Sequence, residues 1–390
     1  MPNPFEDDDP VVGALDPAAN PFRPGMGLVP PDFGGRQEPL RRAKVVLDRL
    51  TRLVPPPFVL YRGVRGVGKT ALLAYVRARA AERGLVTVHL EADRDDAELV
   101  TAREALTHGA AGLVDGADGE VVRGLAAVRR TRDGEVALRS AGTPAATFEA
   151  LIADVATLAG HRRRAVLLTV DEVHEAGDLV LKPLLRAAHR VAQDGHPLGV
   201  LMSGLPSAGE HLFREGQTYT ERLERVDLGL LDRDGTAEAI RGPFARHADA
   251  EVDELVVDAV HDGSGGYPWF VQLWGAALWD RAARPDRIEL PDARSAGEEL
   301  HDRVGAFFAD RWGRVPSGRA TSLVVALAEH GGDADLADVL EVLDLTHQAV
   351  SPARRDLLDL GLCWVPGRGR LAFTVPGFAD WVVRTRPDRA

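Results

Sequence analysis

Hydrophobic and polar residues follow one another along this chain in a pattern that predicts alternating strands and helices. The apolar runs with the length of a strand lie at residues 58–61, 85–92, 165–170, 198–202 and 226–230. Amphipathic segments with the periodicity of a helix lie at residues 70–83, 143–160 and 179–193. Strands that alternate with helices predict an α/β domain with a parallel sheet and right-handed crossovers.

The second half of the chain has a different pattern. Residues 232–283 are helical in character throughout, and we expect a small all-helical lid over residues 232–300. Residues 311–390 form the next predicted domain. Its expected helices and strands lie at residues 320–329, 336–343, 346–360, 362–365 and 371–375. Three helices followed by a hairpin indicate a winged-helix domain, although a short helical bundle with a hairpin has the same pattern.

The segments before and within the α/β domain are less regular. Residues 1–35 are rich in Pro, Gly and Asn, and we expect an extended leader, either packed as an arm on the next domain or framing a nucleotide base. The α/β domain is expected to span residues 36–231. Residues 93–142 have poor periodicity and are interpreted as an insertion within it.

Composition limits the classes of function. The 390 residues carry a net charge of −12, which argues against bulk attraction to nucleic acid but leaves room for a local basic face. The single cysteine, Cys363, excludes a disulfide framework and a cysteine-based zinc site. The N-terminus does not read as a signal peptide, and the apolar runs are too short to span a bilayer. We therefore expect a cytoplasmic protein with no membrane partner.

The most informative motif is a glycine-rich loop between the first strand and the helix after it. Its sequence, Gly-Val-Arg-Gly-Val-Gly-Lys-Thr, has the G-x-x-x-x-G-K-T spacing of a phosphate-binding P-loop. Glycines let backbone N–H groups surround an anion, and the helix N-terminus adds partial positive charge. Lys69 can reach the β- and γ-phosphates, and the Thr70 hydroxyl can bind Mg²⁺. The expected nucleotide-binding residues are Gly63, Val64, Arg65, Gly66, Val67, Gly68, Lys69, Thr70 and Ala71.

Polar residues follow the other predicted strands. Asp171 and Glu172 come after the strand at residues 165–170, where Asp171 can hold Mg²⁺ and Glu172 can polarise the attacking water. Ser203 follows the strand at residues 198–202, either as a polar group near the γ-phosphate or as a simple turn residue. Arg222 and Arg225 precede the last strand. Either arginine can neutralise charge on a neighbouring subunit's phosphate, or be an ordinary surface residue.

Taken together, these motifs resemble the AAA+ superfamily. The segments GVRGVGKT, AVLLTVDE, GVLMSGLP, TERLERVDL and GGYP are similar to the branch that joins origin-recognition ATPases, archaeal-type ATPases and STAND switch ATPases. The resemblance implies an AAA+-type P-loop sheet domain with a helical lid and a winged helix. It also implies that Ser203 is at the sensor 1 position, Arg222 at the arginine-finger position, and Arg36 and Pro268 near the base.

The same resemblance implies ATP or ADP and Mg²⁺ as cofactors, and an ATPase activity in which Glu172, Arg222 and Ser203 are catalytic. The sequence lacks an arginine after the sensor strand and an evident sensor 2 arginine near Pro268, which favours slow hydrolysis. We expect a molecular switch with a winged-helix output to DNA or protein, or a signalling scaffold that oligomerises on ATP with little turnover. A non-catalytic adaptor is a third alternative, against which Glu172 speaks. Residues 311–390 hold equal numbers of arginines and acidic residues, so DNA and protein remain equally good partners.

Overall fold

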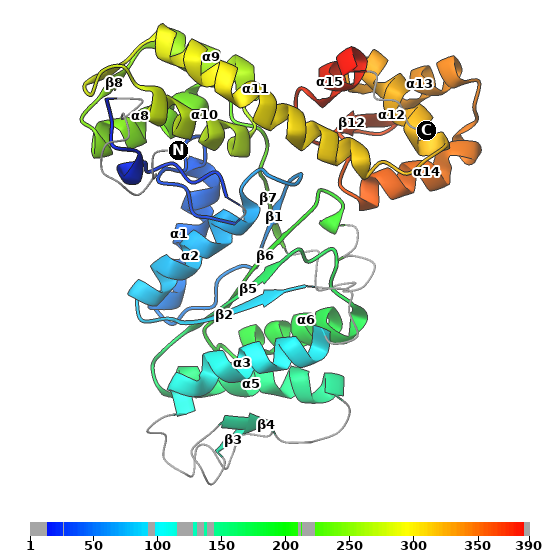
Figure 1. Ribbon diagram of the computed structural model, residues 1–390. Coiled ribbons are helices and arrows are strands. Elements are labelled where there is room, and N and C mark those ends of the chain that lie inside the picture. The colour runs from blue at the N-terminus through cyan, green and yellow to red at the C-terminus, as the bar shows by residue number, and fades with distance from the viewer. Residues whose placement is uncertain are drawn as a thin grey trace, which may run out of the picture. The chain divides into compact units, whose positions relative to one another are not determined.

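The computed structural model describes residues 14–25, 27–92, 98–114, 128–130, 136–138, 144–209, 212 and 223–385. They form two compact units, which are described separately (Figure 1). The α/β unit comprises residues 37–63 and 68–228, and the helical unit comprises residues 1–36, 64–67 and 229–390. The tip of the P-loop, Val64–Val67, is therefore counted with the helical unit.

The α/β unit is built on a five-stranded sheet with the strand order β2-β5-β6-β1-β7. Every neighbouring pair of these strands is parallel, as the alternation of strands and helices predicts. The strands are β1 (Val59–Arg62), β2 (Val86–Glu91), β5 (Val166–Asp171), β6 (Leu198–Gly204) and β7 (Glu224–Asp227). All residues of β5 and β6 are buried, because helices cover both faces of a parallel sheet.

Helices cover the sheet on two sides, with α1 and α2 on one side and α3, α5 and α6 on the other (Figure 1). Their bounds are α1 (Gln37–Thr51), α2 (Lys69–Glu82), α3 (Glu98–Val114), α5 (Pro144–His161) and α6 (Asp178–Gln193). The predicted helices over α2, α5 and α6 are confirmed. Helix α3 lies within the segment expected to be an insertion and packs against β2 and α5. The same segment contributes a small antiparallel pair, β3 (Val128–Arg130) and β4 (Val136–Leu138).

The helical unit begins with the lid helices, which are accompanied by one short parallel strand pair. Its elements are α8 (Arg233–His247), β8 (Glu251–Val252), α9 (Glu254–Ser264), α10 (Pro268–Arg281), β9 (Arg287–Ile288) and α11 (Leu290–Gly313). The leader packs on these helices after the short turn η1 (Pro17–Ala19). The Asn20 side-chain amide donates to Asp280 at 2.9 Å, and the Trp269 indole donates to the Pro24 carbonyl at 3.0 Å.

The C-terminal part of the helical unit contains the predicted helices α12 (Arg319–Glu329), α13 (Leu336–Leu343) and α14 (His347–Asp359). The predicted hairpin is confirmed as β11 (Cys363–Trp364) and β12 (Arg370–Phe373). The sequence pattern missed β10 (Asp333–Asp335), which pairs with β12, and the final helix α15 (Phe378–Thr385).

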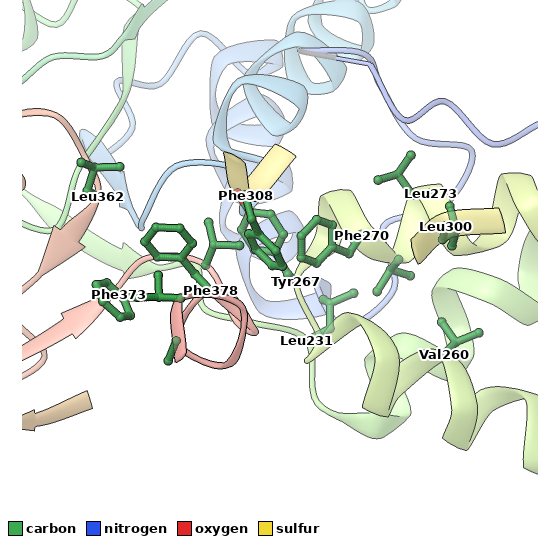
Figure 2. Close-up of a cluster of buried hydrophobic side chains, with 14 of the residues drawn as sticks. Leu231, Val260, Tyr267, Phe270, Leu273, Leu300, Phe308, Leu362, Phe373 and Phe378 are labelled. Carbon is green, nitrogen blue, oxygen red and sulfur yellow. The ribbon is translucent and has the colours of Figure 1, made fainter. Parts of the chain in front are cut away.

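One hydrophobic core runs through the whole helical unit (Figure 2). Phe308 of α11 lies 5.9 Å from Phe270 of α10 and 5.8 Å from Phe378 of α15, measured between ring centroids. Large aromatic side chains contribute strongly to cores, and edge-to-face contacts favour a defined geometry. The lid and the C-terminal elements therefore share one hydrophobic core.

Candidate nucleotide-binding site

The P-loop connects β1 to α2, and its conformation depends on glycine at two positions. Gly66 has φ +82° and Gly68 has φ +93°, a region that residues with a Cβ atom adopt at a cost. Helix α2 begins at Lys69, directly after Gly68. The Lys69 ammonium is buried and donates to the Gly63 carbonyl at 3.0 Å. This ammonium therefore lies against the start of the loop, where a phosphate-binding lysine is needed.

The carboxyl ends of β5 and β6 bring Asp171 and Ser203 together. Asp171 is the last residue of β5, and both side chains are buried. Sequence reasoning put Ser203 after its strand, but β6 extends to Gly204, so Ser203 lies on the strand itself. Its hydroxyl donates to Asp171 Oδ1, and the Glu172 backbone N–H donates to the same oxygen at 2.9 Å. The carboxylate is thus held in place by two donors.

The P-loop starts beside this pair. The Gly63 backbone N–H donates to the Gly204 carbonyl at 3.2 Å, and Arg62 of β1 is paired in register with Gly204 of β6. Asp171, Ser203 and the first P-loop residue therefore share one edge of the sheet. Ligands of parallel sheets bind at this edge, beyond the carboxyl ends of the strands.

Glu172 is the first residue after β5 and has an unusual backbone conformation. Its φ is +49°, in the left-handed region, where a residue with a side chain is strained by about 1 kcal/mol or more. Its side chain is 28% exposed, whereas Asp171 is almost fully buried. The turn therefore places two neighbouring carboxylates in different environments, the buried one held by donors and the other on a partly exposed side chain.

Arg36 is buried in the helical unit and holds the loop tip. Its guanidinium donates to the Val67 carbonyl at 3.2 Å and to the Gly229 carbonyl at 2.6 Å. Burial lowers the pKa of Arg36 to about 10, while the charge of Asp232 acts in the opposite direction. The side chain is therefore still charged at neutral pH, and it binds carbonyl oxygens of the P-loop.

Tyr267, between Gly266 and Pro268, contacts the same loop tip. Its hydroxyl donates to the Arg65 carbonyl at 2.9 Å, and its ring lies 5.1 Å from that of Phe270 (Figure 2). Burial raises the pKa of Tyr267 to about 12, so the hydroxyl keeps its proton and remains a donor. Pro268 is the first residue of α10. The sequence analysis gave a role to Pro268 but none to Tyr267 individually.

The C-terminal elements also reach Arg65. A Cβ added at Gly361, which has φ +65°, would lie 2.9 Å from both Cδ and Nε of Arg65. Arg311 of α11 is buried and donates to the Gly361 carbonyl at 2.8 Å and to the Thr374 hydroxyl. Arg311 thus holds the Gly361 carbonyl, and the Cα of Gly361 packs closely on Arg65.

Comparison with known proteins agrees with this geometry. A family model described as "AAA ATPase domain" matches residues 32–202, and "Domain of unknown function (DUF8462)" matches residues 305–382. Two similar solved structures are of the ORC2 protein from Aeropyrum pernix. The ADPNP-ADP complexes share 14% identity over 93% of this chain and 97% of that chain, with a TM-score of 0.56. The ADP form shares 14% identity over 93% and 95%, with a TM-score of 0.53.

The fold is that of AAA+ P-loop ATPases. At 14% identity the likeness to ORC2 concerns the fold alone. No curated protein matches the sequence. Within the part of the chain that the structure describes, no helix is long and apolar enough to cross a membrane.

The two arginines that the sequence offered for charge neutralisation have different outcomes. Arg222, expected at the arginine-finger position, lies outside the described residues. Arg225 does not precede the last strand, as the sequence suggested, but lies on β7 and is exposed.

Sequence reasoning also missed Arg77 and His89. Arg77 of α2 and His89 of β2 lie near enough to Asp171 for its charge to raise their pKa values, although burial, the larger effect, lowers both. Their helix and strand positions carry no local signal, so only the fold reveals them.

The oxygen groups available to a metal ion are those of Thr70 and Asp171, both in the α/β unit. Among the described residues no group of three or more His, Cys, Asp or Glu side chains could hold a metal ion without further ligands. A hydroxyl and one carboxylate fit Mg²⁺, which keeps several waters and binds through few protein ligands together with substrate phosphates. The donor set of Thr70 and Asp171 is therefore compatible with a magnesium–nucleotide complex.

Proposed function

We propose that this protein is an ATP-binding, slowly hydrolysing AAA+/STAND-like molecular switch that couples its nucleotide state to a winged-helix output. The observation that carries the proposal is the shared sheet edge. Asp171 and Ser203 lie at the carboxyl ends of adjacent parallel strands, and the Gly63 N–H donates to the Gly204 carbonyl at the point where the P-loop begins. A phosphate tail with its metal needs a lysine and a carboxylate at such an edge, and the chain supplies both.

Each residue has a definite task in this proposal. The backbone N–H groups from Val64 to Thr70 and the Lys69 ammonium bind the phosphates. Thr70 and Asp171 would hold Mg²⁺, which neutralises charge that develops on the transferred phosphoryl group. Glu172, whose side chain is partly exposed, orients and deprotonates the attacking water, and Ser203 keeps the Asp171 carboxylate in place.

The switch part of the proposal is supported by the contacts at Arg65. The lid touches this residue through Tyr267, and the C-terminal elements touch it through Gly361. If the loop tip moves on nucleotide binding, one or both of these contacts must change. A 2.9 Å hydrogen bond and close packing do not tolerate a displacement of the loop. The C-terminal elements are therefore well placed to respond to the nucleotide.

A winged-helix output is supported by three helices and a three-stranded antiparallel sheet in the order β10-β12-β11. Helix α14 presents Arg355 and Asp356 to solvent, so its surface carries both signs of charge. Arg370, in the expected wing, forms a 2.7 Å ion pair with Asp333. This pairing uses one of the two wing cations that DNA phosphates would need, which favours a protein partner over DNA.

Binding and hydrolysis assays test the nucleotide part of the proposal. Lys69→Ala should weaken ATP binding by about tenfold or more, because a charged hydrogen-bond donor is lost. Lys182→Ala is the matched control, since Lys182 is partly exposed and pairs with Asp178 of the same helix at 2.6 Å. Glu172→Gln should bind ATP normally and lower kcat by a factor on the order of 100. Equal ATP affinity in the parent and both lysine variants would contradict a nucleotide site.

The same samples distinguish a switch from a scaffold. ATP-dependent growth in particle size, measured by light scattering, without phosphate release would replace the switch by a nucleotide-gated oligomerisation scaffold. A gel-shift assay at stated salt tests DNA as the output. If Arg368→Ala and Arg370→Ala bind DNA as the parent does, or if the parent binds none, the wing does not contact DNA.

A further inference from the structure

His174 is a buried histidine three residues after Asp171, in the turn between β5 and α6. It is 7% exposed and faces two carboxylates of the same turn. Its Nδ1 lies 3.4 Å from Glu172 Oε2, and its Nε2 lies 3.3 Å from Glu175 Oε1. The neighbouring strand β6 reaches the same ring, because the Leu205 backbone N–H donates to His174 Nδ1 at 3.4 Å.

One ring nitrogen therefore faces two groups with opposite requirements. The Leu205 N–H needs a lone pair on Nδ1, whereas the Glu172 carboxylate needs a proton there. A neutral imidazole carries a hydrogen on only one nitrogen, so Nδ1 can serve one of these groups at a time. With the lone pair on Nδ1, the hydrogen is on Nε2, the nitrogen that lies 3.3 Å from Glu175 Oε1. With the hydrogen on Nδ1, the ring binds Glu172 and gives up Leu205.

The His174 ring is closely packed in this position. A Cβ at Gly204 would lie 3.3 Å from Nδ1 and 3.2 Å from Val173, so a larger residue would crowd the ring. The Val173 backbone N–H donates to the Ser203 carbonyl at 2.8 Å, which ties the turn to β6. Glu175 lies at the other end of the ring. The ring, which is 7% exposed, is therefore enclosed between the end of β6 and its own turn.

We propose that His174 is a positioning residue that sets the orientation of the Glu172 carboxylate according to the position of the Gly204–Leu205 turn. This inference rests on the proposed function, because Glu172 matters only if it acts on a bound nucleotide. Leu205 comes two residues after Ser203, so movement at the end of β6 reaches Nδ1 through one backbone N–H. Release of Leu205 lets Nδ1 take the proton and hold Glu172, and return of Leu205 frees Glu172 again.

A matched pair of substitutions separates the two ends of the ring. His174→Asn keeps an amide group near the place of Nδ1, and His174→Gln keeps one near the place of Nε2. We expect His174→Asn to keep kcat for ATP within about twofold, and His174→Gln to lower it by about tenfold, since loss of orientation acts on the chemical step. KM should stay within about twofold of the parent in both variants. His161→Asn, at an exposed position, is the control.

A second measurement does not depend on activity. Nitrogen-15 NMR of the full chain, with His174 assigned through His174→Asn, reports which ring nitrogen carries the hydrogen. We expect the hydrogen on Nε2 without nucleotide and on Nδ1 with Mg²⁺ and a non-hydrolysable ATP analogue. A shift of the hydrogen in a protein that does not hydrolyse ATP would reject the ATPase proposal and keep the positioning role. Equal kcat losses in the two His174 variants, or an unchanged ring nitrogen, would overturn the inference.

Discussion

The hydroxyl of Tyr267 donates a 2.9 Å hydrogen bond to the backbone carbonyl of Arg65, although 202 residues separate the two along the chain. The bond places a lid residue directly over Gly66, where a Cβ would lie 1.8 Å from the hydroxyl oxygen. The glycine at this position is thus required twice, by its own φ of +82° and by the tyrosine above it. The tip of the P-loop is held by a side chain that no P-loop motif includes.

Tyr267→Phe should loosen the P-loop tip without disturbing the core. The ring keeps its contact with Phe270, while the loop carbonyl loses a bond worth about 1 kcal/mol. We expect amide hydrogen exchange at residues 64–67 to become about fivefold faster, measured by mass spectrometry. Tyr61→Phe is the control, because its hydroxyl bonds the Pro39 carbonyl at 3.3 Å, away from the tip. Unchanged exchange at residues 64–67 would show that the tyrosine hydroxyl does not restrain the tip.

Alanine at Gly66 should be more harmful than alanine at Gly68. Both glycines have positive φ, so each substitution costs about 1 kcal/mol of backbone strain. A Cβ at Gly68 meets nothing within 4 Å, whereas one at Gly66 must displace Tyr267. We expect Gly66→Ala to lower the free energy of unfolding by about 1–3 kcal/mol more than Gly68→Ala, measured by urea denaturation without nucleotide.

A double-mutant cycle checks the cause of that difference. In a Tyr267→Ala background, the effect of Gly66→Ala should fall to that of Gly68→Ala, because the clash is gone and only strain remains. If the effect of Gly66→Ala is the same with and without the tyrosine, the clash does not explain the need for glycine.

His89 should make the protein less stable in mild acid. Burial and the nearby Arg77 lower the pKa of His89 below its usual 6.5, against the opposing charge of Asp171. Between the folded pKa and 6.5 the unfolded chain binds more protons, so the free energy of unfolding falls as pH drops through this range. His89→Asn, which can keep the 3.0 Å bond to Thr169, should reduce the fall in Tm between about pH 7 and about pH 5.5.

The control for this pH effect is His161→Asn, at an exposed position at the end of α5. It should leave the dependence of Tm on pH as it is in the parent. An equal fall in Tm for the parent and His89→Asn would place the acid sensitivity elsewhere in the chain.

The only cysteine, Cys363, should be unreactive while the protein is folded. It is buried on β11, and burial raises the pKa of its thiol to about 12. At pH 8 the reactive thiolate is then a fraction on the order of one in ten thousand. We expect Ellman's reagent to label the native protein only on the time scale of unfolding, and the urea-denatured protein at once. Rapid labelling of the native protein would mean that β11 opens readily to solvent.

Much of the α/β unit could be predicted from the sequence. Each strand of the sheet begins and ends within three residues of its predicted bounds. The agreement is good because buried parallel strands are continuous apolar runs. Strand β10 was missed because Asp333 and Asp335 are exposed and only Ala334 is apolar, so it has no strand pattern of its own and forms by pairing with β12. The predicted lid ended at residue 300, whereas helix α11 continues to Gly313 and carries Phe308 and Trp312 into the core.

The candidate site shows the same division. The sequence alone determined the P-loop and the acidic pair at Asp171 and Glu172, because glycine conformations, a helix start and a strand end depend on neighbouring residues. Only the tertiary structure decided that Tyr267 and Gly361 lie on Arg65. The same holds for the bond from Arg36 to the Val67 carbonyl. It also holds for the position of His174 between Glu172 and Leu205. These pairs are joined by the path of the chain through two packed cores, and no local pattern records which distant residues that path brings together.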